Sequence, residues 1–174
     1  FYVENTAVTF DIEKPTGDFA IKKAEEFSGK YPFIVAKADG KTVGYAYAGV
    51  FKNREAYDRC VESTVYVSCG RKRSGIGKKL YAALENILKK QGFLNICACI
   101  AYTENEDLYL TKDSVKFHEK CGFRLVGRFE KCGYKFGRWY DMVWMEKHIG
   151  KHTENPPPII PFNKIESEGL YEKN

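Results

Sequence analysis

The stretch that decides the fold runs from Glu62 to Gln91 and reads ESTVYV (62–67), SCGRKRSGIGK (68–78) and KLYAALENILKKQ (79–91). The first part is short, alternating and rich in Val and Thr, which is typical of a strand. The last part repeats apolar residues at helical spacing, so one face of a helix is buried while its lysines face water. The sequence therefore predicts a strand, a basic glycine-rich turn and a helix.

The turn has the composition of an anion site. Gly75 and Gly77 stand at the predicted helix start, beside Arg71, Lys72 and Arg73. The first N–H groups of a helix lack intrahelical acceptors and lie at the positive end of its dipole, so they attract phosphates. We expect a phosphate-bearing ligand here.

Two nucleotide-binding motifs fail at this turn. A mononucleotide P-loop that starts at Gly70 needs lysine where Ile76 stands. A dinucleotide fingerprint that starts at Gly75 needs glycine where Leu80 stands. Both motifs lose a key residue.

Composition indicates one globular domain. The chain has 174 residues, of which 44% are hydrophobic, enough for one sizeable core. We expect a single domain over residues 1–150 and an extended tail over 151–174, because NPPPIIPF cannot form a helix or a central strand. Since the chain opens at Phe1 without methionine, we also expect a strand and a helix to precede it.

Charge and cysteine usage limit the partners. The net charge of +5 is concentrated at Arg71–Lys79 rather than along a face, which argues against nucleic acid. No apolar run is long enough to span a membrane and no signal peptide is evident, so we expect a cytoplasmic protein. The six cysteines contain no C-x-x-C pair and are expected to be buried or half-buried thiols.

The remaining elements follow from local signals. We expect a helix over 16–28, capped by Thr16 or Asp18, and a hairpin of strands 31–38 and 41–47 around Asp39-Gly40, which favours a type I′ turn. A buried strand over 93–100 should lie parallel to strand 62–67. A short helix capped by Ser114 should precede a final antiparallel hairpin of strands 123–129 and 139–147.

The turn resembles a known cofactor loop. Arg71-x-x-x-Gly75-x-Gly77, after strand TVYV, is similar to the pyrophosphate loop of the GNAT superfamily of N-acetyltransferases, with Arg71 or Arg73 in the leading position. From Val3 to about Phe162 the chain resembles the phosphinothricin acetyltransferase branch of that superfamily. The matching stretches are ENTAVTF, KYPFIVA, GYAYAG, FKNREAYD, VESTVYVS, SGIGKKLY, QGF, FHEKCGF and CGYKFGRWYDMVW.

This resemblance implies an α/β (α+β) fold in which helices flank a mixed, mainly antiparallel sheet that splays open at the cofactor strand. It implies acetyl-CoA as co-substrate, a homodimer, and no metal. The residues implied to bind acetyl-CoA are Val65, Tyr66, Val67, Arg71, Arg73, Ser74, Gly75, Ile76, Gly77 and Lys78. An insertion, YTENEDLYLTKDS (102–114), fills the region where the family places a cofactor-binding asparagine, and Asn105 or Asp113 is a candidate replacement.

The resemblance also implies catalytic roles. Acetyl transfer to an amine needs a base, a stabilised oxyanion and a proton for the leaving thiolate. Glu62 occupies the position of the general base, and the Val67 N–H is the candidate oxyanion donor. His118 is the candidate proton donor or acceptor-orienting group. An ordinary strand carboxylate and a structural histidine are the alternatives.

The acceptor is implied to be a small amino-acid-like amine of the phosphinothricin or methionine sulfoximine type. Lys52, Arg54 and Tyr57 match family positions near the acceptor, where cations would pair with an anionic group. Phe10, Trp139 and Tyr140 are candidate aromatic walls, with core packing as the alternative. Another amine, a protein N-terminus, a non-catalytic acetyl-CoA-binding module and a nucleic-acid accessory role are the competing functions.

Overall fold

The computed structural model describes residues 1–27 and 29–165. The chain forms two compact units. The first unit contains residues 1–19 and 97–147, and the second contains residues 20–96 together with the described part of 148–174. Each is described separately below.

The strands of the second unit form an antiparallel meander. β1 (Phe33–Ala38) pairs with β2 (Lys41–Val50), and β2 pairs with β3 (Cys60–Val67). Asp39 and Gly40 have φ angles of 52° and 71° between β1 and β2. Both values are positive, as a type I′ turn requires, so the hairpin predicted from this dipeptide is confirmed.

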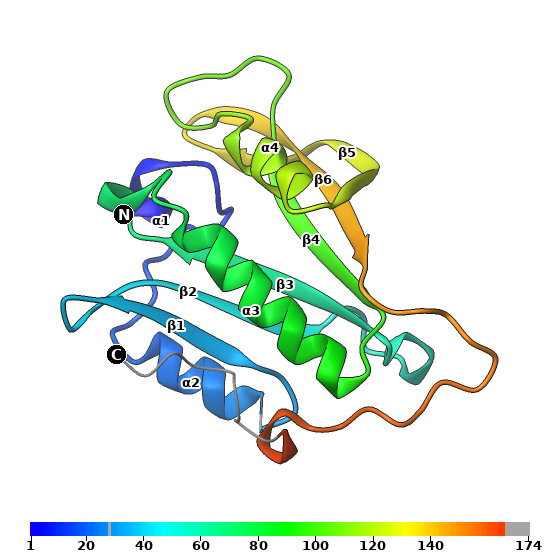
Figure 1. The fold of residues 1–174 in the computed structure, drawn as a ribbon. Helices are drawn as coiled ribbons and strands as arrows, with labels where there is room; N and C mark the ends of the chain where they lie inside the picture. Colours follow the sequence, from blue (N-terminus) through cyan, green and yellow to red (C-terminus); the bar gives the residue numbers. More distant parts are fainter. Residues whose placement is uncertain (28, 166–174) are drawn as a thin grey trace. The chain divides into compact units, whose positions relative to one another are not determined.

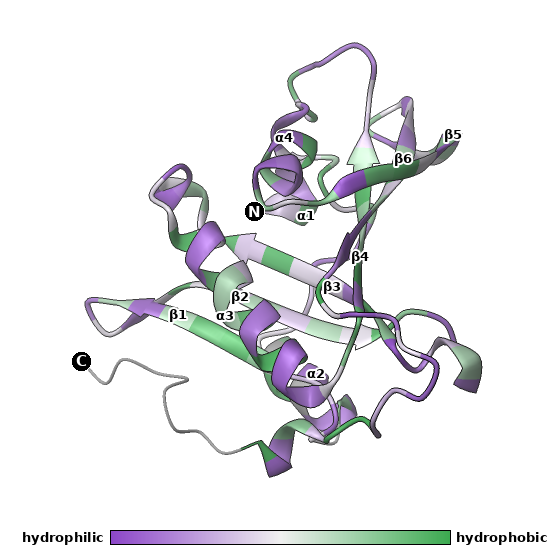
Figure 2. Cartoon of the chain, turned by 45° about the vertical axis from the view of Figure 1, so that its right-hand side comes forward, coloured by the Kyte–Doolittle hydropathy of each residue, from purple (hydrophilic) through white to green (hydrophobic). Residues whose placement is uncertain are grey.

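Helix α3 (Ile76–Gln91) packs on these three strands (Figure 1). Its apolar side chains at Leu80, Leu84, Ile87 and Leu88 are buried, while hydrophilic positions mark its outer surface in Figure 2. Glycines in the left-handed region stand at both ends of α3. The predicted strand, turn and helix are confirmed.

Helix α2 (Phe19–Glu26) is shorter than predicted. The Thr16 carbonyl accepts from the Phe19 N–H at 3.0 Å, and the Thr16 hydroxyl donates to the Asp18 carboxylate just before the helix. Ser28, at the end of the predicted range, lies outside the described residues.

The tail crosses the second unit as an extended segment with one short helix, η3 (Phe162–Lys164). Gln91 holds it from both directions: the Ile160 N–H donates to the Gln91 carbonyl, and Gln91 Nε2 donates to the Ile160 carbonyl, each at 2.8 Å. Arg59 donates to the carbonyls of Pro156 and Pro157. Residues 166–174 of the predicted tail lie outside the described residues.

In the first unit the strand order is β4 (Asn95–Tyr102), β6 (Arg138–His148), β5 (Arg124–Lys135), with β4 beginning at the end of the second unit. Strand β4 begins two residues later than predicted because the Phe93 N–H still bonds the Leu88 carbonyl at the end of α3. A four-residue helix, α1 (Tyr2–Asn5), opens the chain.

The final hairpin is antiparallel as predicted, but β5 is six residues longer at its end than the predicted strand. The stretch interpreted as a connection, KCGYKFGR, is mostly strand. A bulge at Lys131, with φ of 48°, lets the strand continue, and the Asp141 carboxylate accepts from the Lys131 N–H at 2.7 Å. The actual turn is Phe136-Gly137.

The helix predicted to be capped by Ser114 is α4 (Asp113–Lys120). The predicted cap is wrong: Lys112 is the N-cap residue, and Ser114 lies inside the first turn. Asp113 instead opens the helix, where a carboxylate is favoured by the helix dipole.

The described strands form a six-stranded, mainly antiparallel sheet flanked by helices, so the predicted α/β fold class is confirmed. The predicted splay of the sheet stays a prediction. In the described part of the chain, no helix is both long enough and apolar enough to cross a membrane.

Candidate functional site

Strand β3 presents part of its backbone on the side away from β2. The Ser68 N–H donates to the Val43 carbonyl at 2.8 Å, which marks a hydrogen-bonded pair of the β2–β3 ladder. Hydrogen-bonded and non-hydrogen-bonded pairs alternate along an antiparallel ladder, so the next pair, Gly44 with Val67, points its N–H groups outward. The same alternation turns the Val65 N–H away from β2.

The basic turn between β3 and α3 has a constrained backbone. A short helix, η2 (Cys69–Arg71), is followed by Arg73 and Gly75 with φ angles of 60° and 83°. The Ser74 hydroxyl donates to the Arg71 carbonyl at 2.6 Å and closes the turn. A left-handed conformation costs a residue other than glycine about 1–2 kcal/mol, and such strain collects at functional sites.

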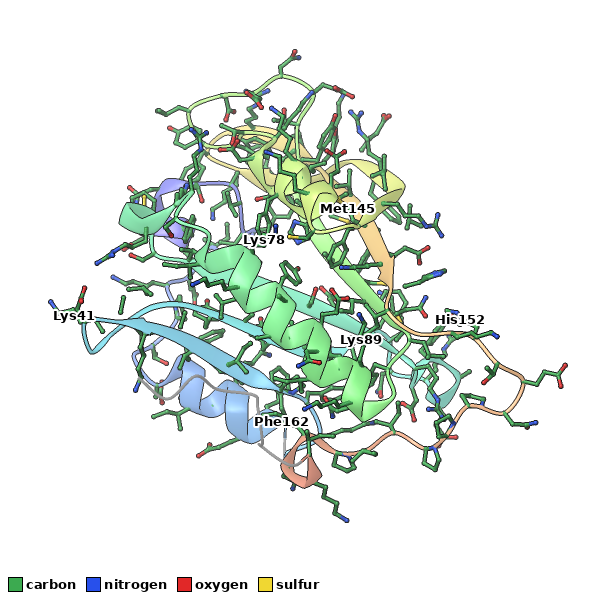
Figure 3. All side chains as sticks on the ribbon, viewed as in Figure 1. Lys41, Lys78, Lys89, Met145, His152 and Phe162 are labelled. Carbon is green, nitrogen blue, oxygen red and sulfur yellow. The ribbon has the colours of Figure 1, made fainter. Side chains whose placement is uncertain are left out.

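The turn directs backbone donors out of the start of α3. The Lys79 N–H donates to the Gly75 carbonyl at 3.1 Å, so the N–H groups of Ile76, Gly77 and Lys78 precede the intrahelical series. Lys78 marks this end of α3 in Figure 3, and Lys89 lies toward the other. Such donors at the positive end of a helix, with exposed cations beside them, suit a phosphate.

The Glu62 side chain lies on the face of β3 opposite to α3. Ser63 faces α3, because its hydroxyl lies 3.0 Å from the Tyr81 hydroxyl in that helix, and successive strand residues point to opposite faces. Burial raises the pKa of the Glu62 carboxyl, against the positive charge of Lys52, which lowers it. A half-buried carboxylate with a raised pKa is a better base than an exposed one.

In the loop between β2 and β3, two of the residues predicted to bind the acceptor, Lys52 and Tyr57, pack against the Phe51 ring. The Lys52 ammonium lies 5.1 Å from the centre of the Phe51 ring, and Tyr57 meets the same ring edge-on at 5.8 Å. Tyr57 ends the short helix η1 (Glu55–Tyr57), and Arg54 is its exposed N-cap residue. Lys52 thus links this loop to Glu62 electrostatically.

His118 belongs to the first unit and is 6% exposed. Its Nδ1 lies 2.7 Å from the Ser114 carbonyl, and the rings of Phe117 and Phe123 meet it edge-on. Burial lowers the pKa of His118 more than the hydrogen bond to Ser114 raises it. The ring is therefore neutral near pH 7, with a proton on Nδ1 and Nε2 as an acceptor.

The aromatic candidates of the first unit have different environments. Tyr140 is 1% exposed and donates its hydroxyl to Asp107 at 2.8 Å, so it is a core residue. Trp139 is 57% exposed. Phe10 is half-buried and packs against a small core that includes Tyr140 and Leu110.

The Asp107 carboxylate, which the sequence analysis did not identify, joins the insertion (102–114) to β6. Asp107 accepts from Arg138 at 2.6 Å and from the Tyr140 hydroxyl at 2.8 Å. The Asn105 carbonyl also accepts from Arg138, at 3.3 Å, and Asp113 is the first residue of α4. These contacts give no evidence that Asn105 or Asp113 binds the cofactor, so that role stays a prediction.

Comparison with known proteins gives the class. The family model of the acetyltransferase (GNAT) domain matches residues 1–144. A phosphinothricin N-acetyltransferase of Streptomyces viridochromogenes is 35% identical over 164 residues, covering 94% of this chain and 85% of that protein. An L-methionine sulfoximine/L-methionine sulfone acetyltransferase of Salmonella typhimurium is 29% identical and covers 71% of this chain and 68% of that protein.

A solved structure gives the same result. The crystal structure of a GNAT superfamily phosphinothricin acetyltransferase from Sinorhizobium meliloti, in complex with acetyl-CoA, matches with a TM-score of 0.77 and 31% identity. It covers 92% of this chain and 86% of that chain. This chain belongs to the GNAT acetyltransferase family. Within it, the chain falls in the phosphinothricin acetyltransferase-like branch and is an N-acetyltransferase, so the family predicted from the sequence is confirmed.

Proposed function

We propose that this enzyme transfers the acetyl group of acetyl-CoA to the α-amino group of a small amino-acid-like acceptor, of the phosphinothricin or methionine sulfoximine type. The observation that carries the proposal is the neighbourhood of Lys52 and Glu62. An amino acid carries an anionic group and an ammonium close together. In this proposal the Lys52 ammonium pairs with the anionic group of the acceptor, and the half-buried Glu62 carboxylate takes the proton from its ammonium. The names of the relatives support this acceptor class.

Acetyl-CoA runs along β3 in this proposal, and its pyrophosphate rests at the start of α3. The course along β3 is what the family resemblance implies. One observation supports the position of the pyrophosphate: the donors that the left-handed Gly75 directs out of the start of α3. The proposed contacts are Val65, Tyr66, Val67, Arg71, Arg73, Ser74, Gly75, Ile76, Gly77 and Lys78. The bound acetyl-CoA in the Sinorhizobium meliloti relative supports the choice of cofactor.

Each chemical step has a candidate group. Glu62 takes a proton from the acceptor ammonium, through a water molecule, and the freed nitrogen attacks the acetyl carbonyl carbon. The Val67 N–H stabilises the oxygen as it becomes negative. The C–S bond then breaks as the acceptor nitrogen loses its second proton and becomes the amide nitrogen, and the CoA thiolate leaves and takes up one proton through solvent, so the protons balance. Because the His118 ring is neutral near pH 7, we assign His118 to orienting the acceptor rather than to supplying this proton.

A panel of acceptors tests the acceptor class. Released CoA thiol is measured with DTNB for phosphinothricin, methionine sulfoximine, methionine sulfone, polyamines and a peptide with a free N-terminus. We expect turnover of the amino-acid analogues to exceed that of the other amines. Strong turnover of polyamines alone would overturn the acceptor class, and binding of acetyl-CoA without turnover of any amine would favour a non-catalytic module.

We further propose a homodimer and a cytoplasmic location. Five large apolar residues of the β5–β6 hairpin are each more than half exposed, which is typical of a protein interface: Leu125, Val126, Phe129, Tyr134 and Trp139. None of the six cysteines, all within the described residues, forms a disulfide, as expected in a reducing compartment. Light scattering on the purified protein tests the dimer. We regard both units as parts of one acetyltransferase domain over residues 1–150, which the family match over 1–144 supports.

A further inference from the structure

Helix α3 lies over a row of small residues in β2. Ser63 of β3 faces α3, and Ala48 is paired with Ser63 across the ladder, so Ala48 points to the same face. Residues two apart on a strand share a face, so Ala46 and Gly44 also point toward α3. Both alanines are fully buried, and Gly44 is buried as well. The side chains of β2 under the helix therefore shrink from alanine to glycine along the strand.

Gly44 lies where the first turn of α3 meets the sheet. A Cβ atom at Gly44 would lie 3.4 Å from Cγ2 of Ile76 and 3.2 Å from Cδ1 of Leu80, which belong to the start of α3. It would also lie 2.8 Å from the carbonyl oxygen of Tyr66 in β3, closer than a Cβ atom comes to a backbone atom. The φ angle of Gly44 is outside the left-handed region, so this position requires space rather than an unusual conformation.

These neighbours belong to the two elements that carry the proposed contacts of acetyl-CoA. Residues 65–67 of β3 and 76–78 of α3 are among those contacts, at the end of α3 that Lys78 marks in Figure 3. Ile76 has two roles, because its side chain packs at Gly44 and its N–H is one of the donors at the start of the helix. The close contact at Gly44 therefore sets how far the pyrophosphate donors lie from the end of β3.

A hydrogen bond between two hydroxyl groups holds α3 to β3 in the second turn of the helix. The hydroxyl groups of Ser63 and Tyr81 lie 3.0 Å apart, and both residues are buried. Breaking a buried hydrogen bond is costly, so this contact opposes sliding of α3 along β3. A methyl group added at Gly44 is therefore accommodated by a change in the distance between the start of α3 and the sheet.

We propose that Gly44 is a positioning residue for acetyl-CoA: it sets the spacing between β3 and the start of α3 so that one cofactor molecule reaches both. This inference rests on the proposed function, because it takes acetyl-CoA to run along β3 and its pyrophosphate to rest at the start of α3. All the residues that carry it belong to the second unit.

Two acetyl donors test the positioning role of Gly44. S-acetylpantetheine has the thioester end of acetyl-CoA but neither its pyrophosphate nor its nucleotide, so it cannot reach the start of α3. The release of thiol is measured for Gly44→Ala and the wild type with each donor. We expect kcat/KM with acetyl-CoA to fall at least about ten-fold, through KM rather than kcat, because a slightly misplaced binding group loses much of its contribution. With S-acetylpantetheine the fall should be less than about three-fold, since that donor does not span the two elements.

Two glycine variants are the controls. Gly127→Ala makes the same change in a strand where nothing lies within 4 Å of the Cβ position. Gly150→Ala places a Cβ atom 2.6 Å from Cδ2 of Leu94, so it introduces a close contact in the second unit outside β2, β3 and α3. We expect neither control to change the ratio of the two kcat/KM values, so a general loss of stability is separated from a loss of spacing.

The outcomes separate this inference from the proposed function. Equal falls with both donors, a fall in kcat alone, or unchanged kinetics with acetyl-CoA would overturn the role of Gly44. If Gly44→Ala does not fold, Tyr81→Phe, which removes the hydrogen bond and keeps the ring, decides by the same comparison of donors. Gly75→Val is measured alongside: unchanged acetyl-CoA kinetics there would defeat the proposed pyrophosphate site. A loss with Gly75→Val but none with Gly44→Ala would defeat the positioning role alone.

Discussion

Glu62 stands directly opposite Gly49 across the β2–β3 ladder, and the Phe27 ring packs where a side chain at Gly49 would lie, 3.2 Å from its Cβ position. Residues paired across a ladder point to the same face, so the Glu62 side chain and the Phe27 ring lie on the same face of the β2–β3 ladder. Glu62 is half-buried, and burial raises the pKa of its carboxyl.

Glu62→Gln keeps the size of the side chain and removes its basicity. We expect kcat/KM near pH 7 to fall about 10²-fold, the usual scale of general-base catalysis, with partial recovery at alkaline pH as free amine becomes available. Acetyl-CoA affinity should hardly change. A variant with the wild-type pH profile would show that solvent or another group takes the proton.

Lys52→Met removes the positive charge that lowers the pKa of Glu62. The pKa then rises further, so the acid limb of the kcat/KM profile should move to higher pH. Lys41→Met, at the exposed start of β2, is the control and should leave the acid limb in place (Figure 3). A higher acceptor KM without any movement of the acid limb would mean that Lys52 binds the acceptor but does not tune the base.

The elements that could be predicted from the sequence are those with strong local signals. The dipeptide Asp39-Gly40 fixed one hairpin, and the apolar stripe with its terminal glycines fixed α3. The family motif also named the turn at Arg71–Gly75, whose backbone has the left-handed conformations that a phosphate loop uses. Local chemistry was sufficient in each case.

The errors have physical causes. The Ser114 cap was wrong because neighbouring polar residues compete for a helix start, and Asp113 was already inside the helix. The run around Gly133 resembles a turn, yet it is strand because a bulge held by Asp141 lets β5 continue. The contacts of Asp107 were missed because they join residues far apart in the chain, and no spacing rule reports such pairs.

Gly75→Val tests the proposed pyrophosphate site. The backbone at Gly75 has φ of 83° with nothing within 4 Å of its Cβ position, so the change introduces backbone strain without a clash inside the chain. We expect a loss of stability of about 1–2 kcal/mol from the left-handed conformation. Acetyl-CoA affinity should fall at least about ten-fold, because a side chain then blocks the approach to the backbone donors.

The matched control is Gly40→Val. Gly40 has φ of 71° and equally open space around its Cβ position, so it carries comparable strain. Its stability should fall by a similar amount while acetyl-CoA affinity is kept. Titration calorimetry measures the acetyl-CoA affinity, and urea unfolding measures the stability. Unchanged affinity in the Gly75 variant would contradict the placement of the pyrophosphate at this turn.

Asp107→Asn tests what holds the insertion. Burial opposes ionisation of Asp107, but hydrogen bonds from Tyr140, Leu110 and Tyr109 and the charge of Arg138 outweigh it, so the pKa of Asp107 is lowered. Burial and the same hydrogen bond raise the pKa of Tyr140 to about 12, which keeps this phenol a donor throughout the neutral range. The carboxylate therefore stabilises the fold through its charge.

Because the folded pKa of Asp107 is below the unfolded one, its contribution is fully present above the unfolded pKa and is lost as pH falls through the folded pKa. At pH 7 we expect Asp107→Asn to lower the free energy of unfolding by about 1–3 kcal/mol, the scale of a lost hydrogen bond to a charged group. The difference in the free energy of unfolding between the variant and the wild type should shrink as the pH is lowered below the ordinary pKa range of an aspartate. Asp113→Asn, at the exposed start of α4, is the control and should change the unfolding midpoint much less. Urea unfolding across this pH series checks the prediction, and a gap that stays constant at every pH would assign the loss to packing instead of charge.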